Sequence, residues 1–545
     1  MIRAGLLTAA LALTALAAPA QSQPGSASFT ISGTVRSATT GAPLDRAEVT
    51  LSTGEEYESQ VAEVITAEGG AFRFDRLPAG KYSLAASRRG YVAADYQEHE
   101  GGYSTAIVTG PGLVSQGLRF NLFPTAVIDG TITDDNGDPV GGAQVTLYRQ
   151  QQEGGQSKIV TADALTTEDD GTYEFDRLHA GTYYIGVSAT PWYAFHAPQR
   201  TAADGTPLSP DQQPHSSLDV AYPMTFYPNA TDSASAAPIQ INAGDHPELD
   251  LTLHAVPAVH IEIRLPKPDP HHGFSMPQIE QNVFGVEQFQ PPHPTIYSSG
   301  DEMIVDLGAV APGHYSLRDF GPDGPTRSTS VDLTTDQTVD LSTAINTVDV
   351  SGKLEMATGA ALPPVTMLQL APAGGAGTMS TPASADGSFD LRTVSPGDYT
   401  VQVSTSTGPL DVIQMAASGA EVHGRRVTIG SDPVLLAAEL ARGSASISGY
   451  ARRDGKGLGG ALVLLVPEHS QDNTDLFRLD QSDSDGSFSL SHVLPGNYTL
   501  IAIENGWSLE WSRPEALAPY LTRGMPLHII GEEKNLDLPS AVDVQ

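Results

Sequence analysis

The chain contains 545 residues, with 29 Lys and Arg against 64 Asp and Glu, no cysteine and a formal net charge of −35. The lack of cysteine excludes disulfides, thiolate metal sites and a cysteine nucleophile. The excess of negative charge argues against nucleic acid and anionic lipid as partners, because both carry phosphate.

The first twenty residues have the order of a secretory signal peptide. A basic start at Met1–Arg3 precedes an apolar stretch from Ala4 to Ala18, and Ala18-Pro19-Ala20 precedes Gln21. We predict a signal peptide over residues 1–20 and an exported mature protein that is periplasmic, associated with the outer surface or secreted. The alternative is a membrane anchor, but about 15 apolar residues are fewer than the roughly 20 that span a bilayer. Since no later apolar stretch is longer, we expect that the mature chain is not an integral membrane protein. Export and the lack of cysteine together suggest a bacterial source.

One thirteen-residue motif recurs at intervals of about 100 residues. The first copy runs from Gly70-Ala71-Phe72 to Gly80-Lys81-Tyr82, three more follow the same pattern, and a degraded copy runs from Met303 to Tyr315. Fixed self-similarity of this length indicates tandem duplication of one small domain. We predict five β-sandwich repeats, the second with a long aromatic insertion and the third divergent, over residues 27–123, 124–255, 256–344, 345–442 and 443–540.

The repeats share further strand signals. Four begin with an Ile/Val-x-Gly strand, and 45 to 51 residues separate its glycine from the glycine of Gly-x-Tyr, which favours one topology. In repeat 1, Ala47, Val49 and Leu51 alternate with polar residues, a period of two that places them against a core. Repeat 3 lacks the glycine, so Val259-His260-Ile261 stands alone as its first-strand signal. The four glycines are Gly33, Gly130, Gly352 and Gly449.

Each repeat contains a Gly-x-Tyr at its returning strand. The glycine stands where a turn needs a residue that tolerates positive φ. A tyrosine at a sandwich corner usually buries its ring and ties its hydroxyl to the backbone, so we interpret these residues as structural. The pairs are Gly80 and Tyr82, Gly181 and Tyr183, Gly313 and Tyr315, Gly397 and Tyr399, and Gly496 and Tyr498.

In this order, Ile-x-Gly, Gly-x-Pro-Val/Leu-x-x-Ala-x-Val, Asp-Gly-x-Phe/Tyr and Pro-Gly-x-Tyr resemble the carboxypeptidase regulatory-like domain. The resemblance implies an all-β chain, a tandem array of about five transthyretin-like or immunoglobulin-like β-sandwiches. Such modules are grouped with starch-binding-like (carbohydrate-binding-like) and collagen-adhesin B-type folds. They serve as spacers, adhesins, sugar binders and appendages of enzymes, so the resemblance specifies fold better than function.

The sequence shows no catalytic motif. A zinc peptidase would need neighbouring His and Glu ligands, but neither His-x-x-Glu nor His-Glu-x-x-His occurs. There is also no Gly-x-Ser-x-Gly elbow and no phosphate-binding glycine loop. We therefore expect the accessory module without its peptidase, and no enzyme. An enzyme with a novel site would need a pocket of convergent ionisable groups.

Two further patterns bear on metal binding and on covalent cross-links. Asp134, Asn136 and Asp138 group oxygen atoms as calcium loops do, but no full twelve-residue loop follows, so an ordinary turn is favoured and no cofactor is expected. Collagen-adhesin B-type modules can carry a Lys-Asn isopeptide bond between first and last strands. Here Arg36 takes the lysine position, although Asn121 lies on the closing strand, and the repeat of Lys353 offers no asparagine on its closing strand, so we expect no cross-link.

Long insertions after the Gly-x-Tyr strand contain all three tryptophans. Exposed aromatic clusters bind sugar rings or protein partners, whereas buried ones would form a satellite core under the insertion. The ligand-binding candidates are Trp192, Tyr193, Trp507 and Trp511. We predict a non-catalytic protein that binds a polysaccharide or an envelope or extracellular protein through these residues. The alternative is a passive spacer or protein-docking component. We also predict that Pro514–Leu521 forms a short helix over a sheet edge.

Overall fold

The computed structural model describes residues 28–545 except 54–58, 100–101, 195–215, 267–275, 291–294, 300–301, 322–323, 341–347, 373–377, 443–444, 472 and 531–534. The signal-peptide prediction therefore lies outside the described residues. Strands dominate the described part, and its one α-helix is α1 (Pro514–Leu521). The all-β class predicted from the sequence is confirmed.

Repeats 1 and 2 are sandwiches of two sheets. The strands of repeat 1 are β1 (Phe29–Ser37), β2 (Glu48–Thr53), β3 (Ser59–Ile65), β4 (Ala71–Leu77), β5 (Gly80–Ser87), β6 (Ala94–Asp95), β7 (Ile107–Thr109) and β8 (Gln116–Leu122). Those of repeat 2 are β9 (Ala126–Thr133), β10 (Gln144–Glu153), β11 (Gln156–Thr166), β12 (Thr172–Leu178), β13 (Gly181–Ser188), β14 (Val220–Ala221), β15 (Thr225–Phe226), β16 (Ile239–Ile241) and β17 (Leu251–Thr252). The sheet orders correspond: β4-β1-β8 and β3-β2-β5-β6 in repeat 1, and β12-β9-β17 and β11-β10-β13-β15 in repeat 2.

Repeat 3 keeps this plan, with sheets β22-β23-β19-β26 and β21-β20-β24-β25. Its strands are β18 (Val256–Pro257), β19 (Val259–Pro266), β20 (Gln278–Val283), β21 (Val286–Gln290), β22 (Thr295–Ser299), β23 (Glu302–Val310), β24 (Gly313–Gly321), β25 (Gly324–Leu333) and β26 (Gln337–Asp340).

Repeat 4 departs from the plan because one long strand joins its two sheets. This strand, β32 (Gly408–Ser418), pairs first with β31 (Gly397–Thr405) and then with β35 (Val434–Ala441), and its register shifts between Val412 and Gln414. The sheets thereby merge into one of nine strands. The other strands are β27 (Val348–Met356), β28 (Met367–Pro372), β29 (Met379–Pro382), β30 (Ser388–Val394), β33 (Ala420–His423) and β34 (Arg426–Ile429).

Repeat 5 has sheets β37-β36-β40, which also includes β43 and β44, and β39-β38-β41-β42. Its strands are β36 (Ala445–Arg453), β37 (Lys456–Gly457), β38 (Leu462–Pro467), β39 (Arg478–Gln481), β40 (Ser487–Val493), β41 (Gly496–Ile503), β42 (Met525–Ile529), β43 (Asn535–Asp537) and β44 (Val542–Asp543). In every repeat the first strand pairs antiparallel with the strand before Gly-x-Tyr and parallel with the last strand.

Each repeat has its own hydrophobic core. In repeat 1, Ala47, Val49 and Leu51 are fully buried while Glu48 is exposed, as the alternation predicted. The inner faces of the two sheets supply these side chains, because successive residues of a strand point to opposite faces.

The first-strand glycine leaves space for an aromatic ring. Gly33 lies opposite Phe72, and a Cβ on Gly33 would come within 2.7 Å of the ring. The same pairing occurs between glycine and aromatic in three other repeats. In repeat 3 the register places Ile263 opposite Val305, both fully buried. The predicted absence of the first-strand glycine in repeat 3 is therefore confirmed: Ile263 occupies the glycine position, and the smaller Val305 replaces the aromatic ring.

The prediction that the Gly-x-Tyr glycines need positive φ was wrong for Gly80, Gly181 and Gly313, which begin their strands without it. The Gly-x-Tyr tyrosines are all buried. Tyr82 donates a hydrogen bond to the carbonyl of Pro78, four residues earlier, at 3.1 Å. Tyr183, Tyr315 and Tyr399 make the equivalent bond at 2.8 Å. Each hydroxyl thus satisfies a carbonyl of the turn that precedes its strand.

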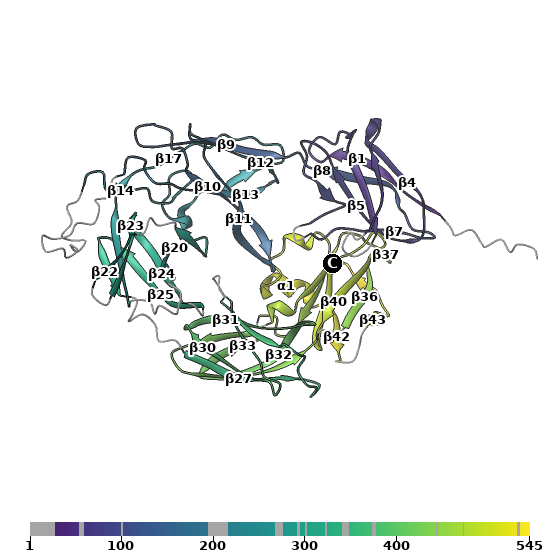
Figure 1. Cartoon of the computed structure of the whole chain (residues 1–545). Coiled ribbons are helices and arrows are strands. Elements are labelled where there is room, and N and C mark those ends of the chain that lie inside the picture. Colours follow the sequence, from purple (N-terminus) through teal and green to yellow (C-terminus); the bar gives the residue numbers. More distant parts are fainter. Residues whose placement is uncertain are drawn as a thin grey trace, which may run out of the picture.

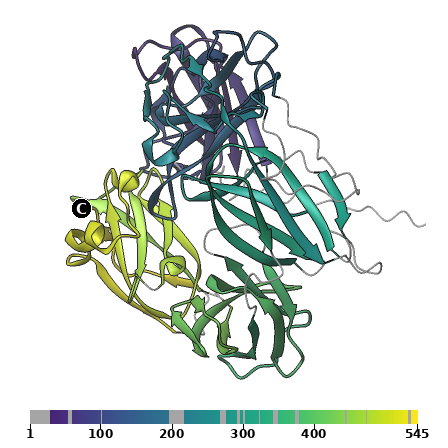
Figure 2. The same ribbon diagram turned by 90° about the vertical axis from the view of Figure 1, so that its left-hand side faces the viewer.

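The five repeats follow one another around a closed ring. Figure 1 shows repeat 5, in yellow, returning to lie beside repeat 1, in purple, and the β10–β11 hairpin of repeat 2 reaching toward α1. Figure 2, turned by 90°, shows repeats 3, 4 and 5 as separate sandwiches, with repeats 1 and 2 one behind the other. Residues nearly 400 positions apart in sequence are therefore in contact.

Candidate binding surfaces

The insertion of repeat 5 forms a second layer on the sheet that contains β38 and β41. Leu517 of α1 is buried with Leu464 and Ile501, which face away from the sandwich core. The predicted helix is confirmed, but it covers the face of the sheet and not its edge. The physical reason is visible in β38, all of whose residues are buried: a strand that is apolar on both faces needs a cover on each.

Trp511 lies between this layer and repeat 2. Its ring packs against Phe477 at a centroid distance of 4.9 Å. It also lies directly on Gly155 in the β10–β11 turn, where a Cβ would come within 2.3 Å of the indole. The next residue, Ser512, donates its hydroxyl to the Gly155 carbonyl at 2.9 Å. Trp511 is therefore part of a contact between repeats 5 and 2.

Trp507 contacts repeat 1. Its indole stacks on His99 at 4.9 Å with an interplanar angle of 13° and lies 5.1 Å from Tyr103. The indole N–H donates to the carbonyl of Gly460 at 3.2 Å. Trp507 thus joins insertions of two different repeats, and both of its partners come from the insertion of repeat 1.

Buried hydrogen bonds surround this stack. The side-chain amide of Gln481, 1% exposed, donates to the Gln97 carbonyl and to Thr105 Oγ1, both at 2.8 Å, and its Oε1 lies 2.8 Å from His99 Nδ1. Ser484 N–H donates to the carbonyl of Ala106 at 2.9 Å. Because buried polar groups are costly without partners, these bonds specify one docking geometry.

Charged groups lie at the same contact. Lys81 of repeat 1 pairs with Asp483 at 2.8 Å, and the Asp483 side chain is only 4% exposed. Burial raises the pKa of Asp483, although Lys81 opposes that shift. Burial also raises the pKa of Asp480 to about 6, and this carboxylate interacts electrostatically with Lys81 and Tyr103 of repeat 1. We name the contacts of Trp507, Gln481 and Asp483 with repeat 1 the closure interface.

Trp192 and Tyr193 lie elsewhere, on the insertion of repeat 2. Trp192 is 84% exposed, the highest value among large apolar side chains in the described part of the chain. Its ring lies perpendicular to that of Tyr193 at 5.8 Å, and the Tyr193 hydroxyl is hydrogen-bonded to Tyr222. Phe195, two residues beyond Tyr193, lies outside the described residues. The structure thus places the four candidate ligand-binding residues in two separate groups.

Other insertion aromatics are buried at the contact between repeats 2 and 3. Phe226 packs with Tyr148 and with Phe284 of repeat 3, and the Tyr148 hydroxyl donates to Gln288 Oε1 of repeat 3 at 2.9 Å. The sequence reasoning missed Tyr148, Phe284, His99 and Gln481 as contact residues. A local signal existed only for Tyr148, which breaks the alternation of β10 with an apolar ring on the outer face.

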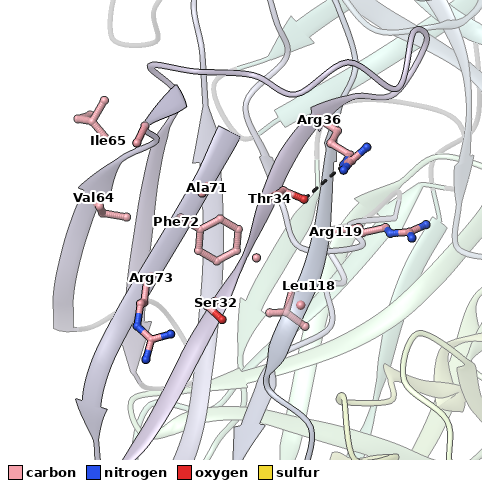
Figure 3. Close-up of a pocket in the computed structure, with 13 residues that line it drawn as sticks. Ser32, Thr34, Arg36, Val64, Ile65, Ala71, Phe72, Arg73, Leu118 and Arg119 are labelled. Atoms are coloured by element: carbon pink, nitrogen blue, oxygen red, sulfur yellow. Dashed lines mark hydrogen bonds between the residues drawn. The ribbon is translucent and has the colours of Figure 1, made fainter. Parts of the chain in front are cut away.

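The outer faces of two equivalent sheets form open grooves. In repeat 1 the groove has a volume of about 640 Å³ and is lined by β4, β1 and β8 together with the end of β3. Figure 3 shows Arg36 and Arg119 on one side of this groove and Arg73 on the other, with Ser32 and Thr34 between. In repeat 2 the corresponding groove, of about 440 Å³, is lined by acidic residues, namely Asp129, Glu168, Glu174 and Glu248.

The acidic turn Asp134–Asp138 is closed by hydrogen bonds among its own residues. Asp134 Oδ1 accepts the backbone N–H groups of Asn136 at 2.8 Å and Asp138 at 3.0 Å, which is the geometry of an Asx turn. In the described ranges no group of three or more His, Cys, Asp or Glu side chains is placed to hold a metal ion. Arg36 lies opposite Asn121, and Lys353 pairs with Glu355.

Residues 30–109 and 127–211 match the carboxypeptidase regulatory-like domain family. The resemblance is thereby confirmed, with family domains in repeats 1 and 2. No curated protein sequence matches the chain. Among the helices of the described residues, none is long and apolar enough to cross a membrane.

Several solved structures are similar at low scores. The TIE protein of Bacillus anthracis is 10% identical with a TM-score of 0.16, over 77% of this chain and 75% of that chain. A streptococcal ancillary pilin is 9% identical with a TM-score of 0.19, over 57% and 99%. GBS52, the minor pilin of Streptococcus agalactiae, is 15% identical with a TM-score of 0.21, over 44% and 99%. These scores establish neither a shared overall arrangement nor a shared function.

Proposed function

We propose that this chain, which carries carboxypeptidase regulatory-like domains in repeats 1 and 2, is an exported, non-catalytic scaffold of the cell envelope or extracellular space. Its five sandwiches hold surfaces of different repeats in fixed relative positions, on which protein partners dock. The fold by itself does not select this role, since such modules host many functions.

The closure interface is the observation that supports the proposal. Trp507 and Trp511, the two tryptophans of repeat 5, both face other repeats of the same chain. A spacer whose domains moved independently would gain nothing from a buried glutamine with partners in another repeat. Interfaces between domains are usually small and polar, and relative motion is the ordinary expectation. A specific, hydrogen-bonded closure instead favours a fixed arrangement.

Small-angle X-ray scattering of the mature chain tests the closed ring. We expect the double variant Trp507→Ala, Gln481→Ala to have a larger radius of gyration than the wild type, because it loses the aromatic stack and the buried amide together. Trp192→Ala is the matched control, since it removes an exposed tryptophan without touching the closure interface, and its scattering should be unchanged. An unaltered profile for the folded double variant would contradict the proposal.

Carbohydrate binding is the second candidate function, and the exposure of Trp192 favours it. An indole that is 84% exposed beside a tyrosine offers a face on which a sugar ring could stack. Trp507 and Trp511 remain candidates, but their rings already have partners. We expect any binding in a polysaccharide panel to be lost in Trp192→Ala, with the closed ring intact. Retention of binding by that variant would remove Trp192 from the site.

A further inference from the structure

We propose that the groove of repeat 1 binds an acidic polysaccharide. It brings together Arg36, Arg73 and Arg119 on the outer face of one three-stranded sheet. Of the charged residues on that face, Asp75 alone is acidic, and it pairs with Arg73 at 2.8 Å. In a chain with a net charge of −35, a face with a local excess of positive charge is a departure that solubility does not explain.

The equivalent groove of repeat 2 shows that the fold does not require basic residues at these positions. The strand registers align Phe72 with Tyr173 and Phe120 with Leu251. Their neighbours then correspond as Arg73 with Glu174, Arg119 with Asp250, Ser32 with Asp129 and Gln116 with Glu248. The same backbone therefore supports a basic groove in one repeat and an acidic groove in the next.

The arginines are arranged to meet a ligand with several separated charges. Thr34 lies opposite Arg119, and Arg36 is two residues further along β1, which puts the Cα atoms of the two arginines roughly 8 Å apart. Arg73 lies two strands from Arg119, at roughly 12 Å. The Arg36 guanidinium bonds Thr34 and the Gly41 carbonyl. Arg119 is exposed and has no hydrogen-bond or ion-pair partner among the described residues.

Polar neutral side chains between the arginines favour a saccharide over a simple anion. Ser32 and Thr34 supply hydroxyl groups, and Gln116, opposite Ser32, supplies an amide, which are the groups that bond sugar hydroxyls. Arginine forks bind carboxylates and sulfates in two-point geometry. Because the groove is open along the sheet, a linear polymer can bind through the middle of its chain and need not insert a chain end. The negative charge of distant repeats is screened beyond about 8–10 Å at physiological salt.

The test measures binding of the mature chain to polygalacturonate, with its methyl-esterified form as a neutral polymer of the same backbone. The variant Arg73→Glu, Arg119→Asp installs the residues that repeat 2 carries at these positions, so the fold should tolerate it. Arg89→Glu, Arg523→Glu is the control, because both residues are exposed and the change in net charge is the same.

We expect wild type and control to bind polygalacturonate in a salt-dependent manner, with at least about tenfold weaker binding by the groove variant and no binding to the esterified polymer. Equal binding of both polymers, or equal loss in the control, would overturn the inference. So would self-association of wild type that the groove variant abolishes, because the basic groove would then dock on the acidic groove of a second copy. The inference does not depend on the closed ring, which the scattering experiment tests separately.

Discussion

Gly33 shows how single residues set the geometry of these sandwiches. It faces the core, where the ring of Phe72 and the carbonyl of Leu118 take the space that a side chain would need. The Ile263 and Val305 pair of repeat 3 reaches a comparable fit with two medium-sized side chains. The motif Ile-x-Gly is therefore half of a cross-strand pair, and its partner is the aromatic residue eight positions before Gly-x-Tyr.

Gly33→Ala should destabilise repeat 1 by about 1–3 kcal/mol, because the new Cβ would lie 2.7 Å from Phe72 and 2.4 Å from the Leu118 oxygen. Adding Phe72→Leu should cost less than in the wild type, since the ring that causes part of the clash is gone. Hydrogen exchange of β1 and β4 amides in the full chain measures both effects. Ser32→Ala is the control, because its side chain points outward on the same strand. If the free-energy costs of Gly33→Ala and Phe72→Leu simply add in the double variant, the two residues do not act as a pair.

At the scale of elements, β38 and α1 depend on each other. The run Leu462–Pro467 is apolar at successive positions and is buried throughout, so one face packs in the sandwich core and the other under α1. A continuous apolar run is the sequence signal of a strand covered on both sides. The insertion of repeat 5 is therefore part of the folded domain and carries Trp507 and Trp511 on a rigid layer.

Leu517→Ala should cost about 2–5 kcal/mol in the stability of repeat 5, because the side chain is 1% exposed and its removal leaves a cavity against β38. Denaturant unfolding followed by tryptophan fluorescence should show an earlier transition. Ala518→Ser, one residue on and exposed, should shift it by less than about 0.5 kcal/mol. A similar small shift for Leu517→Ala would mean that α1 does not cover the sheet.

At the scale of the whole molecule, the closure interface couples ring geometry to pH. Burial raises the pKa of Asp480 to about 6 and also raises that of Asp483. Opening of the ring would expose these carboxylates to water, so burial makes the closed form bind their protons more tightly, while the contact with Lys81 acts in the opposite direction. We expect burial to dominate, so that closure is favoured as pH falls through about 6 toward 4 and this advantage is lost as pH rises.

Scattering of the destabilised single variant Trp507→Ala between about pH 7.5 and pH 5 tests this coupling. We expect a more compact form at the lower pH, with a change in closing free energy on the order of 1–3 kcal/mol. Adding Asp480→Asn should reduce the dependence of the radius of gyration on pH, because Asp483 is then the remaining group whose pKa burial raises. A ring that opens on acidification would show instead that the Lys81 and Asp483 ion pair dominates.

The periodicities of the sequence determined the β-sandwich class, the five repeats, the buried tyrosines and the short helix, because each depends on neighbours within about 100 residues. The positions of the charged groove residues could also be derived, once one strand register was known. Whether the insertion aromatics bind a ligand or pack against another part of the chain could not be derived from the sequence. Exposed and buried aromatic clusters have the same composition, so the sequence left both readings open.

Only the tertiary structure decided that Trp507 meets His99, that Trp511 meets Gly155 and that Trp192 stays exposed. These outcomes depend on how five separately folded cores are oriented to one another. That orientation is set by a few contacts between distant repeats, such as the bonds of Gln481. Such contacts leave no periodic trace in the sequence, because each occurs once and its two partners lie in different domains.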